Sequence, residues 1–263
     1  MKFTEFSTLL DGDVASLAMF STFQFDPEYF ERQLLHRCSC LHKARRIVVF
    51  MDSGEWRALI QQNINVRLLN RRYLVVPVRC STGVFHPKLS LILTENGGRV
   101  LCGSNNLTRS GCSSNLELLN VLPFDLTEHS FSQMCVASEA FDFFKQAAMN
   151  GLEDAGRIVS EWIEETAASL RWLGRIEKDK EQEGRDVRLV HTYNGSLWDR
   201  LVEHLKALTP TEFFVLSPFH DKGGETALRL SSEWPSSKIN MVVQSGYTNL
   251  NMGPLEKVPG MQL

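Results

Sequence analysis

Short apolar runs separated by polar segments dominate the first part of the chain, and they predict buried strands. The clearest runs cover residues 15–25, 46–51 and 73–78. Two helices are expected between them. The Asp-Pro-Glu segment at 26–28 places proline and acids at a helix start, and residues 53–60 form a second helical candidate. Because strands and helices alternate, the pattern favours an α/β sheet with helices on its faces.

Three further strands are expected at 89–93, 99–102 and 116–122. The first two flank the segment 95–98, whose Asn-Gly pair is a strong signal for a hairpin turn. Residues 136–173 have a mostly helical pattern. The predicted order is thus alternating strands and helices, then a hairpin, then a mostly helical segment.

The pattern of the N-terminal part starts again near residue 213. The segment 213–221 resembles 19–26, since each is an apolar strand that runs into a small polar residue, an aromatic residue and an aspartate. Each segment is followed by a helical stretch and a second strand, at 46–51 and 238–243 respectively. This similarity predicts an internal repeat.

Between the two copies lies a charged run, with ten charged residues among the fifteen at 174–188. Such a run indicates an exposed linker or the solvated end of a helix. We therefore expect a first lobe over residues 1–150, a helical and charged linker over 151–188, and a partial second lobe over 189–263.

Composition restricts the class of protein without naming a function. Of the 263 residues 43% are hydrophobic and 22% are charged, and the formal net charge is −3, which is typical of a globular protein without a broad basic field. Arginines at 45–46, 71–72 and 79 could still form a local surface for nucleic acid, or could simply be solvated.

The sequence suggests a cytoplasmic protein. No run approaches the roughly 18 apolar residues of a membrane-spanning helix, and the first residues lack the apolar core of a signal peptide. The six cysteines form no CxxC pair, so reduced thiols are expected rather than disulfides or a zinc site.

The candidate chemistry is carried by polar residues that follow or precede three neighbouring predicted strands. His86 and Lys88 stand two apart at the start of one strand and should share a face. Ser104 and Asn106 follow the next strand, and Glu117 is expected at the start of another. An imidazole can attack phosphorus, and an ammonium group with neutral donors can stabilise the phosphate oxygens. No acidic cluster suited to magnesium lies nearby.

These residues resemble the HxK…GSxN signature of the phospholipase D superfamily. The resemblance implies that His86 is a nucleophile that forms a phosphohistidine, and that Lys88, Ser104 and Asn106 bind the phosphate. It also implies that Glu117, eleven positions after Asn106, supports the histidine. The implied fold is a mixed sheet flanked by helices, with the start of a second similar lobe.

Two departures from the family pattern refine this picture. Many members carry an aspartate five residues after the lysine, where this chain has Leu93, which favours a nuclease-type over a lipase-type enzyme. The family active site also needs two His-Lys motifs, one of them to protonate the leaving oxygen. His220 and Lys222 match HxK formally, but they follow the first strand of the repeat and are rejected as a second motif.

The missing half of the site is therefore expected from a homodimer partner or from another HxK-bearing lobe. The resulting hypothesis is a nuclease that cleaves DNA without a metal or other cofactor. Restriction or antiviral phage defence, with a helicase or other defence-system subunit as a partner, follows by analogy only. A lipid phosphodiesterase and a non-catalytic lobe that binds nucleic acid or protein are the alternatives, and no membrane partner is expected.

Some residues near the motif have two interpretations. Arg109 could contact the substrate phosphate or only the solvent. Phe23, Phe25 and Phe219 fit a hydrophobic core better than base stacking.

Overall fold

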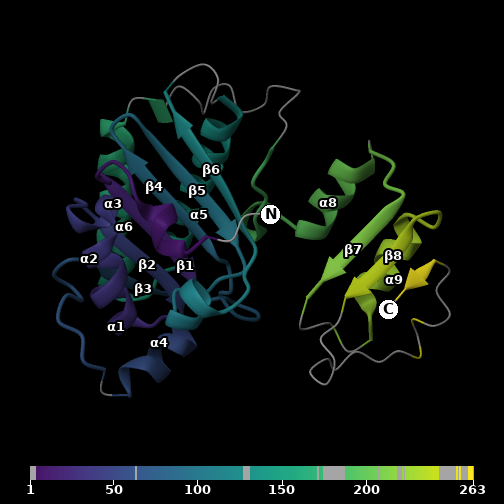
Figure 1. Ribbon diagram of the computed structural model, residues 1–263, viewed down its shortest axis with the longest axis horizontal. Coiled ribbons are helices and arrows are strands. Elements are labelled where there is room, and N and C mark those ends of the chain that lie inside the picture. Colours follow the sequence, from purple (N-terminus) through teal and green to yellow (C-terminus); the bar gives the residue numbers. More distant parts are fainter. Residues whose placement is uncertain are drawn as a thin grey trace. The chain divides into compact units, whose positions relative to one another are not determined.

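The computed structural model divides into two compact units, Met1–Leu189 and Val190–Leu263 (Figure 1). The structure describes residues 4–62, 64–126, 131–170, 172–173, 187–206, 208–217, 221, 223–242, 253, 255 and 260–262. Most of the charged run at 174–188 lies outside these ranges, as do Phe219, His220 and Lys222.

The first unit is built on a six-stranded mixed sheet in the order β3-β2-β1-β4-β5-β6. The strands are β1 (Leu17–Thr22), β2 (Ile47–Asp52), β3 (Leu74–Val78), β4 (Leu89–Thr94), β5 (Gly97–Gly103) and β6 (Leu119–Asp125). β2 pairs in parallel with β1 and β3, whereas β4 lies antiparallel to both β1 and β5, and β6 antiparallel to β5. The predicted α/β class with a mixed sheet is confirmed.

Helices cover both faces of this sheet (Figure 1). Their bounds are η1 (Phe6–Leu10), α1 (Pro27–Tyr29), η2 (Phe30–Leu34), α2 (Leu35–Arg37), α3 (Ser39–His42), α4 (Ser53–Ile60), η3 (Ser110–Ser114), α5 (Phe131–Met149) and α6 (Glu153–Ser169). On one face Phe20 of β1 packs edge-to-face on Phe30, with ring centroids 5.9 Å apart. On the other face Phe50 of β2 packs on Phe144 of α5 at 5.2 Å. Both faces of β1 and β2 are therefore buried, which explains their continuous apolar runs.

Helix starts follow the expected local chemistry. Asp26 accepts a hydrogen bond from the Tyr29 amide at 2.8 Å, and Pro27 occupies the first turn of α1. Asp52, the last residue of β2, is the N-cap of α4 and accepts from the amides of Gly54 and Glu55. Such caps satisfy donors that the first helical turn leaves unpaired.

One strand begins later than its pattern indicates. The run expected at 116–122 forms strand only from Leu119. Leu116 and Leu118 precede it with exposed fractions of 83% and 62%, so these leucines are not part of a buried strand. The prediction was wrong here because an apolar side chain does not by itself show burial.

The second unit contains a three-stranded parallel sheet in the order β7-β8-β9. Its elements are η5 (Thr192–Asn194), α8 (Leu197–Lys206), β7 (Glu212–Leu216), α9 (Glu225–Glu233), β8 (Lys238–Val242) and β9 (Met261–Gln262). Asp221 accepts hydrogen bonds from the first-turn amides of α9, at Glu225 and Thr226, much as Asp26 does for α1. Both units thus contain two parallel strands joined through a helix that begins beside an aspartate.

All six cysteines are free thiols. Across the part of the chain that the structure describes, no helix has both the length and the apolar character required to cross a membrane.

Candidate functional site

The candidate residues gather at one edge of the first unit's sheet. At this edge β1 and β2 end, β4 begins and β5 ends. His86 and Lys88 lie immediately before β4, and the Lys88 carbonyl accepts from the Gly103 amide at the end of β5. Ser104 therefore follows β5 directly beside them. The antiparallel β4–β5 pairing, with its turn at the far end, brings together residues that stand 16 or more positions apart.

His86 is exposed and lies against Lys88 and Phe23. The Lys88 Nζ is 2.7 Å from His86 Nδ1 and 3.2 Å from Nε2, and it donates to the His86 carbonyl at 3.0 Å. The Phe23 ring packs on the imidazole with centroids 4.6 Å apart and an interplanar angle of 40°. Phe23, expected in the core, instead forms a wall of the site, whereas Phe25 packs in the core on Phe30 and Tyr73 as predicted.

This environment shifts the pKa of both groups toward their uncharged forms. Partial burial, followed by the nearby Lys88 ammonium, lowers the pKa of His86 below 6.5, while a backbone hydrogen bond and then the charge of Asp52 oppose this shift. Burial lowers the pKa of Lys88 to about 8, against the opposing effect of Glu117. The imidazole is therefore favoured in its neutral, nucleophilic form near pH 7, at which Lys88 still carries its charge.

Glu117 lies at the same edge and binds Ser104. The Ser104 hydroxyl donates to Glu117 Oε2 at 2.5 Å and accepts from the Leu118 amide at 3.0 Å. The other carboxylate oxygen accepts from Asn115 Nδ2 at 3.2 Å. No hydrogen bond joins Glu117 to His86 among the contacts described, so the carboxylate that the family pattern assigns to the histidine acts here on the serine and, through its charge, on Lys88.

Asn106 connects the loop after β5 to the end of β1. Its Oδ1 accepts from the amides of Phe23 and Gln24, at 3.2 Å each. The neighbouring Leu107 amide donates to the hydroxyl of Thr22 at 3.0 Å. With Oδ1 held in this way, the Nδ2 group of Asn106 is the part that can donate to a ligand.

Arg109 is placed apart from these residues. It is exposed directly before η3, and its charge lowers the pKa of Tyr29 against the larger raising effect of burial. Within the described contacts, none joins its side chain to His86 or Lys88. Arg46, a member of the suggested basic surface, is likewise engaged elsewhere, because it forms an ion pair with Glu165 and donates to the Trp162 carbonyl.

Sequence reasoning missed Asp52. It is 8% exposed and hydrogen bonds the Phe85 amide, one residue before His86, at 2.9 Å. Its position before a predicted helix identifies a cap, but the contact with Phe85 depends on how β2 and β4 are placed in the sheet.

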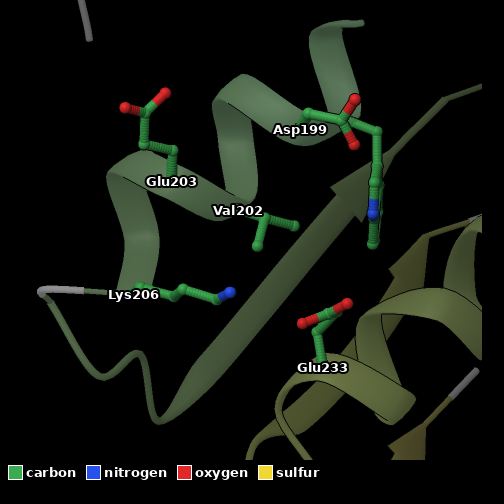
Figure 2. A pocket seen from close by; sticks show the side chains of 6 residues that line it. Asp199, Val202, Glu203, Lys206 and Glu233 are labelled. Carbon is green, nitrogen blue, oxygen red and sulfur yellow. The ribbon is translucent and has the colours of Figure 1, made fainter.

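A hollow of about 450 Å³ lies on the second unit between α8 and α9. Figure 2 shows Lys206 of α8 and Glu233 of α9 extending toward it. The remaining lining residues are Trp198, Asp199, Val202 and Glu203. They provide charges of both signs but no nucleophile beside a base. Within the described ranges, no three His, Cys, Asp or Glu side chains group as metal ligands.

No protein-family model matches the sequence, and no curated protein matches it. Among solved structures, the chain is similar to the crystal structure of polyphosphate kinase from Porphyromonas gingivalis, with a TM-score of 0.47 and 10% sequence identity. The alignment covers 98% of this chain and 37% of that one. The chain therefore spans little more than a third of that kinase.

Proposed function

We propose that the first unit is a metal-independent phosphodiesterase site that cleaves DNA. The observation that carries this proposal is the placement of His86, Lys88, Ser104 and Asn106 at one open edge of the sheet. At this edge His86 provides a nucleophile, Lys88 a cation and the Asn106 Nδ2 group a neutral donor. The Ser104 hydroxyl donates to Glu117 beside them. Cleavage of a phosphate diester needs such groups, because a nucleophile must attack the phosphorus atom while the phosphate oxygens gain negative charge.

The reaction begins with the neutral imidazole of His86. One ring nitrogen attacks phosphorus, the new nitrogen–phosphorus bond forms, and the bond to the leaving oxygen breaks. The leaving oxygen takes a proton from a general acid. Water then attacks the phosphohistidine and gives its proton to the group that acted as the general acid, which releases the second product and restores both groups. Lys88 and the Asn106 Nδ2 group hold the phosphate oxygens during both steps.

The general acid comes from outside the residues gathered here. We propose a second His-Lys motif, supplied by a second copy of the chain or by another HxK-bearing lobe. An exposed His86 supports this arrangement because its outer face is open to such a partner. A two-fold dimer would place both motifs around one phosphate with a single self-complementary interface.

DNA is favoured as the substrate by the openness of the site. The imidazole stands at the surface, where a continuous polymer can reach it without threading into a cavity. A role in restriction or phage defence beside a helicase extends this proposal by analogy. The experiment below distinguishes DNA cleavage from two other functions, which are cleavage of lipid phosphodiesters and binding of nucleic acid without cleavage.

The test is cleavage of plasmid and single-stranded DNA by the full chain in EDTA. Cleavage is expected to continue in EDTA and to be lost in His86→Ala. His36→Ala is the matched control because His36 is an exposed histidine on α2. Quenching the reaction with denaturant at alkaline pH, where a histidine–phosphorus bond survives, should trap end-labelled DNA on the wild-type and His36→Ala proteins but not on His86→Ala.

Four results would contradict the proposal. Loss of cleavage in EDTA would remove the metal-independent mechanism, and unchanged cleavage by His86→Ala would remove the site. DNA binding by both proteins with cleavage by neither would assign a binding function, while release of headgroup from phospholipid vesicles alone would assign a lipid substrate.

A further inference from the structure

Asp52 is a buried carboxylate at the end of β2 whose two oxygens serve different segments. Oδ1 accepts from the amides of Gly54 and Glu55 and so caps α4. Oδ2 accepts from the Phe85 amide at 2.9 Å. A helix cap needs only one acceptor oxygen, so the second oxygen is available to fix a segment 33 residues away.

The segment that it fixes carries the candidate nucleophile. Phe85 is buried, with 3% of its surface exposed, and its ring stacks on Phe143 of α5 at 6.2 Å. His86 follows it directly. The Phe85 backbone is thus held by Asp52 while its ring is held in the core, and together these contacts determine where the chain presents the imidazole.

We propose that Asp52 is a positioning residue for His86, holding the Phe85–His86 backbone from the end of β2. This proposal rests on the proposed function and deepens it by assigning the carboxylate that supports the nucleophile. Among the described contacts Glu117 accepts from Ser104 and Asn115, and none of its hydrogen bonds reaches His86 or the backbone beside it.

Charged groups on the surrounding elements fit this assignment. Burial and then the Lys88 ammonium lower the pKa of His86, whereas a backbone hydrogen bond and then the charge of Asp52 act in the opposite direction. Glu117, from the loop before β6, acts on Lys88. Asp52 is therefore the carboxylate that partly offsets the effect of Lys88 on the histidine.

Asp52→Asn separates the two tasks of this side chain. Asparagine is a good N-cap, so its oxygen can still accept from Gly54 and Glu55. Its Nδ2 group would then face the Phe85 amide, which replaces an acceptor with a donor and removes the charge. Asp26→Asn is the matched control, because Asp26 caps α1 in the same way but lies on the segment after β1.

The readout is the titration of His86 by NMR in the full chain with labelled histidine, with His86→Ala used to assign the signal. In Asp52→Asn the His86 pKa should fall below the wild-type value and its ring signals should shift, while Asp26→Asn leaves both unchanged. If DNA cleavage is present, kcat should fall on the order of 10²-fold, as expected for a misplaced nucleophile, with a smaller change in KM.

An unchanged His86 titration in folded Asp52→Asn would overturn the proposal, even if the protein never cleaves DNA. If the variant does not fold, amide hydrogen exchange of the wild-type protein tests whether Asp52 holds the Phe85 backbone. The Phe85 amide should then exchange at least 10²-fold more slowly than the exposed loop amides at Thr82 and Val84, and equal exchange rates would overturn the proposal. Absence of cleavage with a shifted His86 titration would instead reject the proposed function and keep the positioning role.

Discussion

The Ser104 hydroxyl donates a 2.5 Å hydrogen bond to the carboxylate of Glu117. The two residues are 13 positions apart, and the pairing of β5 with β6 brings them together. A charge-assisted bond of this length orients the serine and keeps the carboxylate near Lys88. Glu117 therefore acts in this site through its neighbours.

Glu117→Gln should shift the alkaline limit of activity. Glutamine keeps an oxygen for the Ser104 hydroxyl but removes the charge that raises the pKa of Lys88. The Lys88 pKa should consequently fall below its wild-type value of about 8. The alkaline limb of the kcat/KM profile should move to lower pH, whereas Glu95→Gln, in the turn at the far end of β4, should leave it in place.

The wild-type profile of kcat/KM against pH should be bell-shaped. Activity should rise as His86 loses its proton, with an apparent pKa below 6.5 because burial and Lys88 favour the neutral imidazole. It should fall toward alkaline pH as the general acid and, above about pH 8, the Lys88 ammonium lose their protons. In Lys88→Arg the contribution of Lys88 to this limb should disappear, since arginine stays protonated. Activity that keeps rising past pH 9 would argue against a charged Lys88 in the reaction.

Much of this fold could be predicted because both faces of its central strands are buried. The apolar runs at β1, β2 and β3 and the turn before β5 correspond to the observed elements. The prediction of a buried strand from residue 116 was wrong, because Leu116 and Leu118 are exposed. A run of leucines does not show which of them face solvent.

The site could be predicted only as a set of residues. The spacing of the sequence motif identifies four candidate residues, His86, Lys88, Ser104 and Asn106. It does not predict which other residues they contact. The hydrogen bond from Phe85 to Asp52 and the packing of Phe23 on His86 depend on β4 lying next to β1. The order of the strands in the sheet depends on contacts between segments that are far apart in the sequence, and local sequence patterns do not specify these contacts.

Gly111→Ala should disturb both stability and the site. A Cβ at this position would lie 2.4 Å from the Asn106 carbonyl oxygen and 2.9 Å from its amide nitrogen, and backbone atoms cannot yield as a flexible side chain can. We expect a loss of about 1–3 kcal/mol, typical of overpacking, measured by urea unfolding. Gly223→Ala is the control, because its nearest contact would be 3.6 Å from the side chain of Glu225. Equal stability of the two variants would contradict the close approach at Asn106.

Asn106→Asp should separate the structural role of this residue from its role toward a ligand. A carboxylate oxygen can still accept from the Phe23 and Gln24 amides, so folding should change by less than about 1 kcal/mol. The Nδ2 donor is lost and a negative charge takes its place, which should repel a phosphate diester and lower kcat/KM by at least about 10²-fold. Asn106→Ala removes the acceptor as well, so it should lose stability in urea unfolding while Asn106→Asp does not. If Asn106→Asp cleaves DNA as fast as the wild-type protein, the Nδ2 group has no part in binding the phosphate, and Asn106 serves only to hold the end of β1.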